Sequence, residues 1–179
     1  MPYREMGNHG RHRLFRLQCG TCHAPEGKRT GTVIPVGEPG LGTDRHRLDM
    51  WTQEAADAYN QFAKGYSWAF HDLRKVVPEG YQAVLLDGLW LRAPYLHNGS
   101  VPNLAALLTP PDARPKRFFR GYDVYDRVNV GFIAEGPEAE RVGVEYDTGA
   151  PGNSNQGHTY GTDLPEEQKR ALIEYLKSL

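Results

Sequence analysis

Cys19 and Cys22 are the only cysteines in this 179-residue chain, and His23 follows the second of them directly. The pattern C-x-x-C-H is the signature of covalent haem attachment, in which each thiol forms a thioether bond with one haem vinyl group. The adjacent imidazole is then placed to bind the iron, for which a neutral histidine nitrogen is a common ligand. The sequence therefore predicts one covalent haem c, with Cys19, Cys22 and His23 holding it.

Three other interpretations of the same cysteines were weighed. A lone C-x-x-C pair also occurs in thioredoxin-like redox proteins, but there it belongs to a βαβ unit that this sequence does not show. The pair could instead supply half of a zinc site, completed by histidines elsewhere in the chain. Those histidines would be His46, His71, His97 or His158. The match could also be a coincidence, but a histidine directly after the second cysteine favours haem over all three.

Bulk composition limits the class of fold and partner. The length fits one domain, residues 1–179, and hydrophobic residues make up only 39% of it, with 20 Gly and 13 Pro. We therefore expect a modest helical core and much irregular chain packed around one haem. A net charge of −1 gives no general attraction to nucleic acid or to a membrane surface, so neither is an expected partner.

The sequence also bears on localisation. The longest apolar run, residues 83–91, is interrupted by Asp87 and is far too short to span a bilayer, so no transmembrane segment is expected. No signal peptide is visible after Met1. Covalent haem attachment of this kind takes place outside the cytoplasm. The protein is therefore expected to be periplasmic or otherwise extracytoplasmic, as a mature form or as a domain of something longer.

Hydrophobic periodicity predicts a mainly α-helical fold around the haem motif. Leu14 and Phe15 contribute the apolar side of a helix over 10–21 that runs into the haem motif. The clearest other helix is the last one, which we expect to be capped by Asp163 and to continue to the end of the chain. These two helices form the ends of the predicted haem domain.

Two further helices are expected between them. Trp51 and Phe62 stand at helical spacing in a predicted helix over 49–64, and we interpret its aromatic side as part of the core. A short helix over 101–108 is expected to begin after Ser100, whose hydroxyl would cap it.

The remaining chain is expected to be irregular. Residues 24–43 are rich in Gly and Pro and predict a loop along one haem edge, where a carbonyl at Pro25 or Pro39 could accept the Nδ1–H of His23. From about 110 to 161 no hydrophobic period persists. We interpret that segment as an extended loop insertion.

Beyond these elements, the chain resembles a known family. A helix entering C-x-x-C-H and a terminal helix ending LIEYLK are typical of cytochromes c, whose first and last helices pack together. Residues 91–100, LRAPYLHNGS, resemble the R-x-A-P-Y-x-H-[DN]-G segment of the bacterial dihaem cytochrome c peroxidase superfamily. Other segments are similar to the branch that contains the dihaem rubber oxygenases. They are VPNL (101–104), RP (114–115), F-x-G (119–121), VGF (130–132), DT (147–148) and PGNSNQGH (151–158).

The chain also departs from that superfamily. Its members carry two C-x-x-C-H motifs in two domains, whereas this chain has one and resembles the C-terminal haem domain, which in the peroxidases transfers electrons. The methionine that serves those peroxidases as a ligand is missing, because no Met follows Ser100. A threonine that helps to bind interdomain calcium is replaced by Arg92, so the resemblance implies no calcium.

Three residues are candidates for the sixth iron ligand: Met50, His97 and His158. Met50 would give a His/Met pair and a high potential, but a buried apolar role is the simpler interpretation. His97 matches a histidine that in the peroxidases lies near the haem without serving as the usual ligand, so we expect it to contact the cofactor. The resemblance implies that His158, in a Gly- and Asn-rich loop, binds the iron. An open sixth position is the remaining alternative.

Trp90 and Arg92 are candidate partners of the haem edge, because an indole N–H and a guanidinium can both donate to propionates. Packing in the core is an equally good interpretation of Trp90.

These observations predict a one-electron carrier with a single haem, axially bound by His23 and His158. No residue is expected to act as acid, base or nucleophile, so we favour electron transfer over catalysis. The expected partner is another redox protein, or a larger electron-transfer complex. The alternative is the haem domain or subunit of a dihaem peroxidase- or oxygenase-type enzyme.

Overall fold

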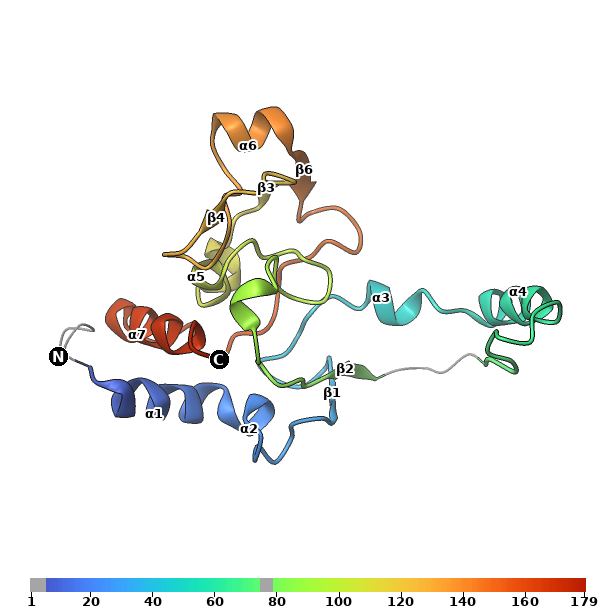
Figure 1. The fold of residues 1–179 in the computed structure, drawn as a ribbon, viewed down its shortest axis with the longest axis horizontal. Helices are drawn as coiled ribbons and strands as arrows, with labels where there is room; N and C mark the ends of the chain where they lie inside the picture. The colour runs from blue at the N-terminus through green and yellow to red at the C-terminus, as the bar shows by residue number, and fades with distance from the viewer. Residues whose placement is uncertain (1–5, 75–78) are drawn as a thin grey trace.

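The computed structural model describes residues 6–74 and 79–179 (Figure 1). Its centre is the contact between the two ends of the chain. Helix α1 (Asn8–Gln18) leads directly into the short helix α2 (Gly20–His23) and packs against α7 (Glu166–Leu176), which lies beside it in Figure 1. The rings of Phe15 and Tyr175 meet in this contact, with centroids 5.1 Å apart.

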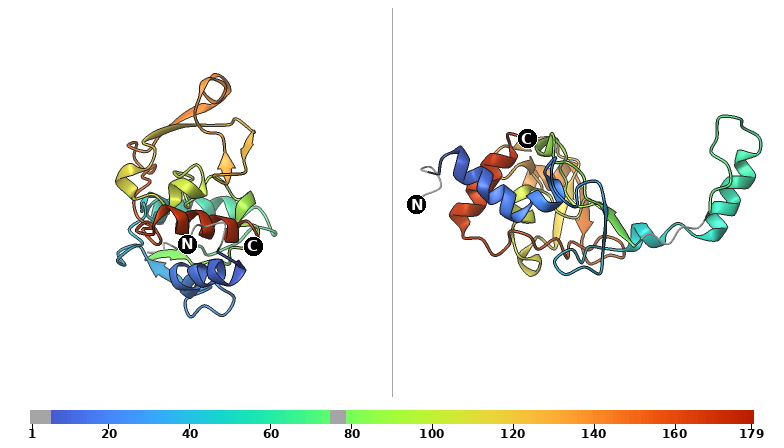
Figure 2. Two further views of the ribbon diagram at one scale, coloured as in Figure 1. Left: turned by 90° about the vertical axis from the view of Figure 1, so that its left-hand side faces the viewer. Right: turned by 90° about the horizontal axis from the view of Figure 1, so that it is seen from below.

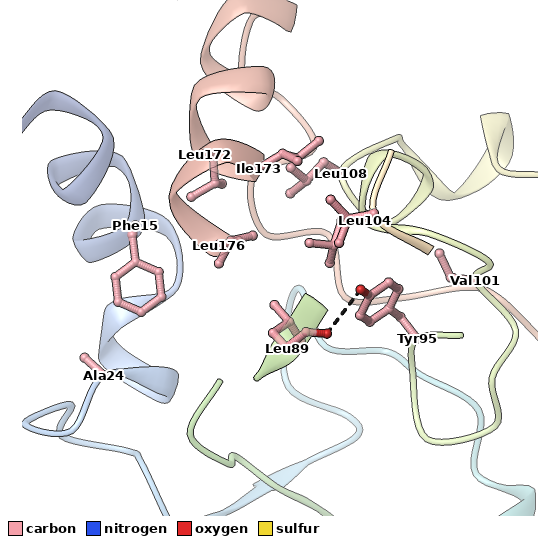
Figure 3. Close-up of a cluster of buried hydrophobic side chains, with 11 residues drawn as sticks. Phe15, Ala24, Leu89, Tyr95, Val101, Leu104, Leu108, Leu172, Ile173 and Leu176 are labelled. Carbon is pink, nitrogen blue, oxygen red and sulfur yellow. Dashed lines mark hydrogen bonds between the residues drawn. The ribbon is translucent and has the colours of Figure 1, made fainter. Parts of the chain in front are cut away.

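The hydrophobic core extends from this helix pair to the middle of the chain (Figure 3). Leu104 and Leu172 are fully buried, and burial of each such side chain is worth about 1.5–3 kcal/mol. The labelled members are Phe15, Ala24, Leu89, Tyr95, Val101, Leu104, Leu108, Leu172, Ile173 and Leu176. The core therefore joins α1 and the C-x-x-C-H motif, the segment from Leu89 to Leu108 and the C-terminal helix α7 into one unit.

The expectation of a mainly α-helical fold is wrong. Of the described residues, 34% are helical and 12% lie in strands, distributed over small sheets. Each sheet is a two-stranded antiparallel ribbon. The pairs are β1 (Val33–Pro35) with β2 (Gly80–Gln82), β3 (Arg117–Arg120) with β6 (Val144–Asp147), and β4 (Tyr125–Asp126) with β5 (Gly131–Phe132).

Most of this strand structure lies in the segment that was expected to be irregular. Residues 110–161 contain β3 to β6 and a helix, α6 (Pro137–Val142), between β5 and β6. Phe118, in β3, is 2% exposed and stacks on Tyr146 of β6 at 5.1 Å. Strands of two to four residues give too short an alternation to be recognised, so the sequence pattern did not indicate them.

The predicted helix over 49–64 is confirmed only for α4, which begins at Gln53 on a projecting arm and is preceded by a separate short helix. Helices α3 (His46–Asp49) and α4 (Gln53–Ala63) are separated by a break, and Thr52 caps α4 by accepting the N–H of Ala55 at 3.1 Å. Figure 2 shows α4 standing away from the body of the molecule. Phe62 is 54% exposed, so its assignment to the core was wrong.

The cap positions also differ from those predicted. The chain after β2 forms a 3₁₀ turn, η2 (Leu89–Leu91), and the next helix is α5 (Leu104–Leu107). Asn103, not Ser100, caps α5 by accepting the N–H of Ala106 at 2.8 Å. Ser100 is instead fully buried. A second 3₁₀ turn, η3 (Pro111–Ala113), follows α5, and α7 begins after Pro165 rather than after an Asp163 cap.

Candidate haem site

His23 is the last residue of α2, and a hydrogen bond fixes its ring. Its Nδ1 lies 2.7 Å from the carbonyl oxygen of Val84. A carbonyl only accepts, so Nδ1 carries the proton and Nε2 keeps a free lone pair. This is the arrangement in which histidine binds a metal, with the second nitrogen orienting the ring. The expectation of a partner at Pro25 or Pro39 was wrong, because the acceptor comes from a segment 61 residues away.

Cys19 is the N-cap of α2, and Cys22 lies within the helix, directly before His23. Neither is in a disulfide, and both are partly buried. Burial, together with the neighbouring Cys22, raises the pKa of Cys19 to about 12. A redox-active C-x-x-C pair needs a thiolate with a lowered pKa. The observed environment has the opposite effect, so it does not support the thioredoxin-like alternative.

His158 faces His23 across the site. The two ring centroids are 6.4 Å apart, with an interplanar angle of 42°. The Nδ1 atom of His158 is buried and has no hydrogen-bond partner among the described residues. Burial, and then the proximity of His23, lower the pKa of His158 to about 4. Its imidazole is therefore neutral at ordinary pH, which is the form that binds a metal.

The backbone around His158 is held against a second loop. Its N–H donates to the carbonyl of Leu41 at 2.5 Å, and the next N–H, of Thr159, donates to Gly40 at 2.8 Å. His158 itself has φ +46°, a left-handed conformation that is uncommon for residues other than glycine and costs free energy. Such strained residues are found where surrounding contacts enforce a functional position.

The geometry of the two histidines can be tested against a haem. A metal–imidazole bond is about 2 Å long and each ring centre lies roughly 1 Å behind its nitrogen, so two imidazoles on opposite sides of one metal ion have centres about 6 Å apart. The observed 6.4 Å fits that arrangement. The Nδ1 of His158 also has no hydrogen-bond partner among the described residues. The residues present therefore fit a haem c.

The other candidate ligands lie in different surroundings. Met50 is 68% exposed between α3 and α4, on the projecting arm. His97 stacks on Tyr81 at 4.0 Å, and its Nε2 is buried without a partner among the described residues. Burial lowers the pKa of His97. No ring contact or hydrogen bond joins either residue to His23 or His158 in the described part of the chain.

Trp90 and Arg92 lie in and directly after η2. The indole of Trp90 is 40% exposed, and its backbone carbonyl accepts the hydroxyl of Tyr125. Arg92 donates to the carbonyls of Leu85, at 3.0 Å, and Asp87. The Arg92 guanidinium thus braces the segment that follows Val84, the acceptor for His23.

In residues 6–74 and 79–179, no group of three or more His, Cys, Asp or Glu side chains could hold a metal ion, so the zinc alternative gains no support. A cavity of about 570 Å³ opens among β3, β6 and β5, and its lining includes the aromatic residues Phe118, Phe132 and Tyr146. None of the predicted haem residues lines it. No helix within the described ranges is both long and apolar enough to cross a membrane.

Sequence reasoning missed three groups that shape this site. They are the carbonyls of Val84 and Leu41 and the side chain of Arg114, which contacts the loop before His158. Backbone carbonyls leave no trace in residue types, so only the fold reveals the first two.

Together, a C-x-x-C-H motif and a second histidine facing its imidazole are the features of a haem-binding cytochrome of c type. The sequence model of one such family, described as RoxA-like, cytochrome c-like, matches residues 80–119. That range contains Val84 and the LRAPYLHNGS segment. The predicted resemblance to a c-type cytochrome domain of this branch is confirmed.

Two curated proteins of Sinorhizobium fredii (strain NBRC 101917 / NGR234) are similar to the chain. The "Uncharacterized protein y4iJ" is 42% identical over 111 residues, which cover 57% of this chain and 18% of that protein. The "Uncharacterized protein y4iM" is 29% identical over 210 residues, covering 92% of this chain and 46% of that protein. The chain thus spans less than half the length of either relative.

Proposed function

We propose that the chain is a monohaem c-type cytochrome unit that carries single electrons. Cys19 and Cys22 hold the haem through thioether bonds, and His23 and His158 are the two axial ligands of its iron. Its partner is another redox protein or a larger electron-transfer complex, and it works in the periplasm or elsewhere outside the cytoplasm.

The observation that carries this proposal is the pair of facing imidazoles. Their ring centres are separated by 6.4 Å, the spacing that one bridging metal ion requires. His23 also has its Nδ1 occupied by Val84, which leaves Nε2 as its only available lone pair. The His23 ring is thus oriented by Val84, while the backbone N–H of His158 is held by the carbonyl of Leu41.

The chain's own residues explain why electron transfer is favoured over catalysis. When bound, the haem supplies an iron that alternates between ferric and ferrous states by one electron. If His23 and His158 both bound the iron, no coordination position would remain for peroxide or dioxygen. Imidazole is also a harder and stronger donor than a thioether, which favours ferric iron and a lower potential. His23 is held by Val84 and His158 by Leu41, so neither ligand has to move when the charge changes.

The test replaces His158 in protein matured with its haem. His158→Ala removes one axial ligand, so we expect the reduced variant to bind carbon monoxide within mixing time, whereas the parent binds it slowly. The absorption spectrum of the oxidised variant should change from low-spin to predominantly high-spin.

Two matched variants serve as controls. His97→Ala and Met50→Ala remove the other two candidate ligands and should keep the low-spin spectrum and slow carbon monoxide binding of the parent. A parent-like spectrum in His158→Ala, or an opened site in either control, would show that His158 is not the ligand.

A second candidate function follows from the length of the relatives. Because the chain spans only 46% of y4iM, it can also be the haem domain of a longer peroxidase- or oxygenase-type enzyme, with a second haem elsewhere. Rapid reaction of the unmodified oxidised protein with cyanide or peroxide would favour this alternative, since a saturated bis-imidazole iron reacts slowly.

A further inference from the structure

Arg114 is a buried cation with an unusual set of partners. The residue is 2% exposed, and no carboxylate of the described residues lies within ion-pairing distance of it. Burial lowers its pKa to about 10, so the guanidinium remains charged at neutral pH. An unpaired buried charge is costly and persists only where other polar groups satisfy it.

Backbone carbonyls satisfy all five of its N–H groups. Nε donates to the carbonyl of Thr109, just beyond the end of α5, at 3.0 Å. One Nη2–H donates to the carbonyl of Leu107, the last residue of α5, at 3.1 Å. The other three donors reach a different loop. They bind the carbonyls of Asn155 (2.5 Å), Gly157 (2.8 Å) and His158 (3.1 Å). A guanidinium has five donors in a fixed plane, and here none is left over.

These contacts join the loop that carries His158 to the end of α5, whose Leu104 belongs to the core. The carbonyl of His158 is held by Arg114, while its N–H is held by Leu41. The two peptide groups that flank the strained Cα of His158 are therefore fixed from opposite sides. Lysine would not replace Arg114, because one ammonium has three donors and no plane to span both segments.

We propose that Arg114 is the positioning residue for the distal iron ligand: it clamps the 155–158 loop so that His158 stays on the iron, and it places an uncompensated positive charge beside the site. This inference rests on the proposed bis-histidine ligation. Reduction lowers the positive charge of the iron, so a nearby cation favours the ferrous state. The clamp and the charge predict two separable effects.

The first experiment compares Arg114→Lys and Arg114→Gln with the parent. Both variants lose the five-fold clamp, so carbon monoxide should bind to the reduced protein roughly 10- to 100-fold faster, the size of effect typical of groups that orient a metal ligand. Arg117→Gln, an exposed arginine of β3, is the matched control and should bind at the parental rate.

The second readout separates charge from position. With saturating imidazole added, the sixth ligand is an imidazole in every protein, supplied either by His158 or by the added compound. Under these conditions Arg114→Lys should keep the parental potential and Arg114→Gln should have a lower one, because only Gln removes the charge. Equal potentials in all three proteins, together with parental carbon monoxide binding, would overturn the proposal.

A measurement on the unmodified protein covers the case in which these variants fail to fold. In the reduced, diamagnetic state, a clamped Arg114 should show separate, slowly exchanging signals for its guanidinium protons, because rotation about its C–N bonds is blocked. Averaged signals like those of exposed arginines would refute the clamp.

If His158→Ala leaves the iron low-spin, the proposed function itself fails. If His158→Ala opens the site while the Arg114 variants do not, only this inference fails.

Discussion

At the scale of single residues, the site depends on backbone groups as much as on side chains. His23 is oriented by one carbonyl, and His158 is held in a left-handed conformation by hydrogen bonds to its N–H and its carbonyl. The residue before it, Gly157, has φ +78°, and a Cβ placed there would overlap the carbonyl oxygen of Leu41. The position of His158, the proposed distal ligand, is thus specified by a neighbouring glycine and by Arg114.

This arrangement predicts the effect of Gly157→Ala. The added methyl group must push the 155–158 loop away from Leu41 and adopt an unfavourable φ, so we expect a loss of about 1–3 kcal/mol in stability and faster carbon monoxide binding. Chemical denaturation and flash photolysis measure the two effects. Gly37→Ala is the control, since nothing lies within 4 Å of its added Cβ. Identical behaviour of the two variants would contradict the described loop contact.

At the scale of elements, the contact between α1 and α7 holds the haem motif in place. Because α1 runs into α2, any shift of α1 on α7 moves the cysteines and His23 together. The partner of α1 comes from the far end of the chain, so the position of the C-x-x-C-H motif depends on a long-range contact.

The variant Leu172→Ala tests that contact. Leu172 is fully buried in α7, and its truncation should lower the free energy of unfolding by about 2–5 kcal/mol. Leu17→Ala, in α1, makes the same chemical change at a side chain that is 68% exposed and should cost little. Denaturant melts of the two variants give the comparison; equal losses would show that α7 does not carry the core described here.

The elements also show which features are readable from sequence. The C-x-x-C-H motif and the amphipathic end helices were recognised because their signals are local and periodic. The ribbons in residues 110–161 were not, because β3 pairs with β6 across a long intervening segment and each strand is short. Similarly, Val84 and the carbonyl partners of Arg114 act through peptide groups that every residue possesses. The cysteines and histidines of the candidate site were accessible to sequence reasoning, but the role of Arg114 and the contacts that orient the histidines required the fold.

At the scale of the whole molecule, the arm that carries α4 is separate from the haem unit. It closes on itself: the Trp51 indole donates to the carbonyl of Arg74 at 3.1 Å, and Asn60 exchanges two hydrogen bonds with Leu73. Its aromatic residues contact one another, with Phe62 and Tyr66 at 4.9 Å. Figure 2 shows this arm extending from the body that contains α1, α2 and α7.

Removing the arm should therefore leave the haem site intact. We expect a variant in which residues 52–73 are replaced by a Gly/Ser linker of about four residues to take up haem and to give the parental low-spin spectrum. The linker suffices because Trp51 and Arg74 already lie close together. Loss of haem, or a high-spin spectrum in the shortened protein, would show that the arm contributes to the site.

The near-infrared magnetic circular dichroism of the oxidised holoprotein tests the facing histidines most directly, because the position of its charge-transfer band identifies the two axial ligands of low-spin ferric haem. The predicted result is the bis-imidazole band, in material whose mass shows one covalently attached haem. A His/Met band, a high-spin spectrum without a second nitrogen ligand, or protein that matures without haem would contradict it.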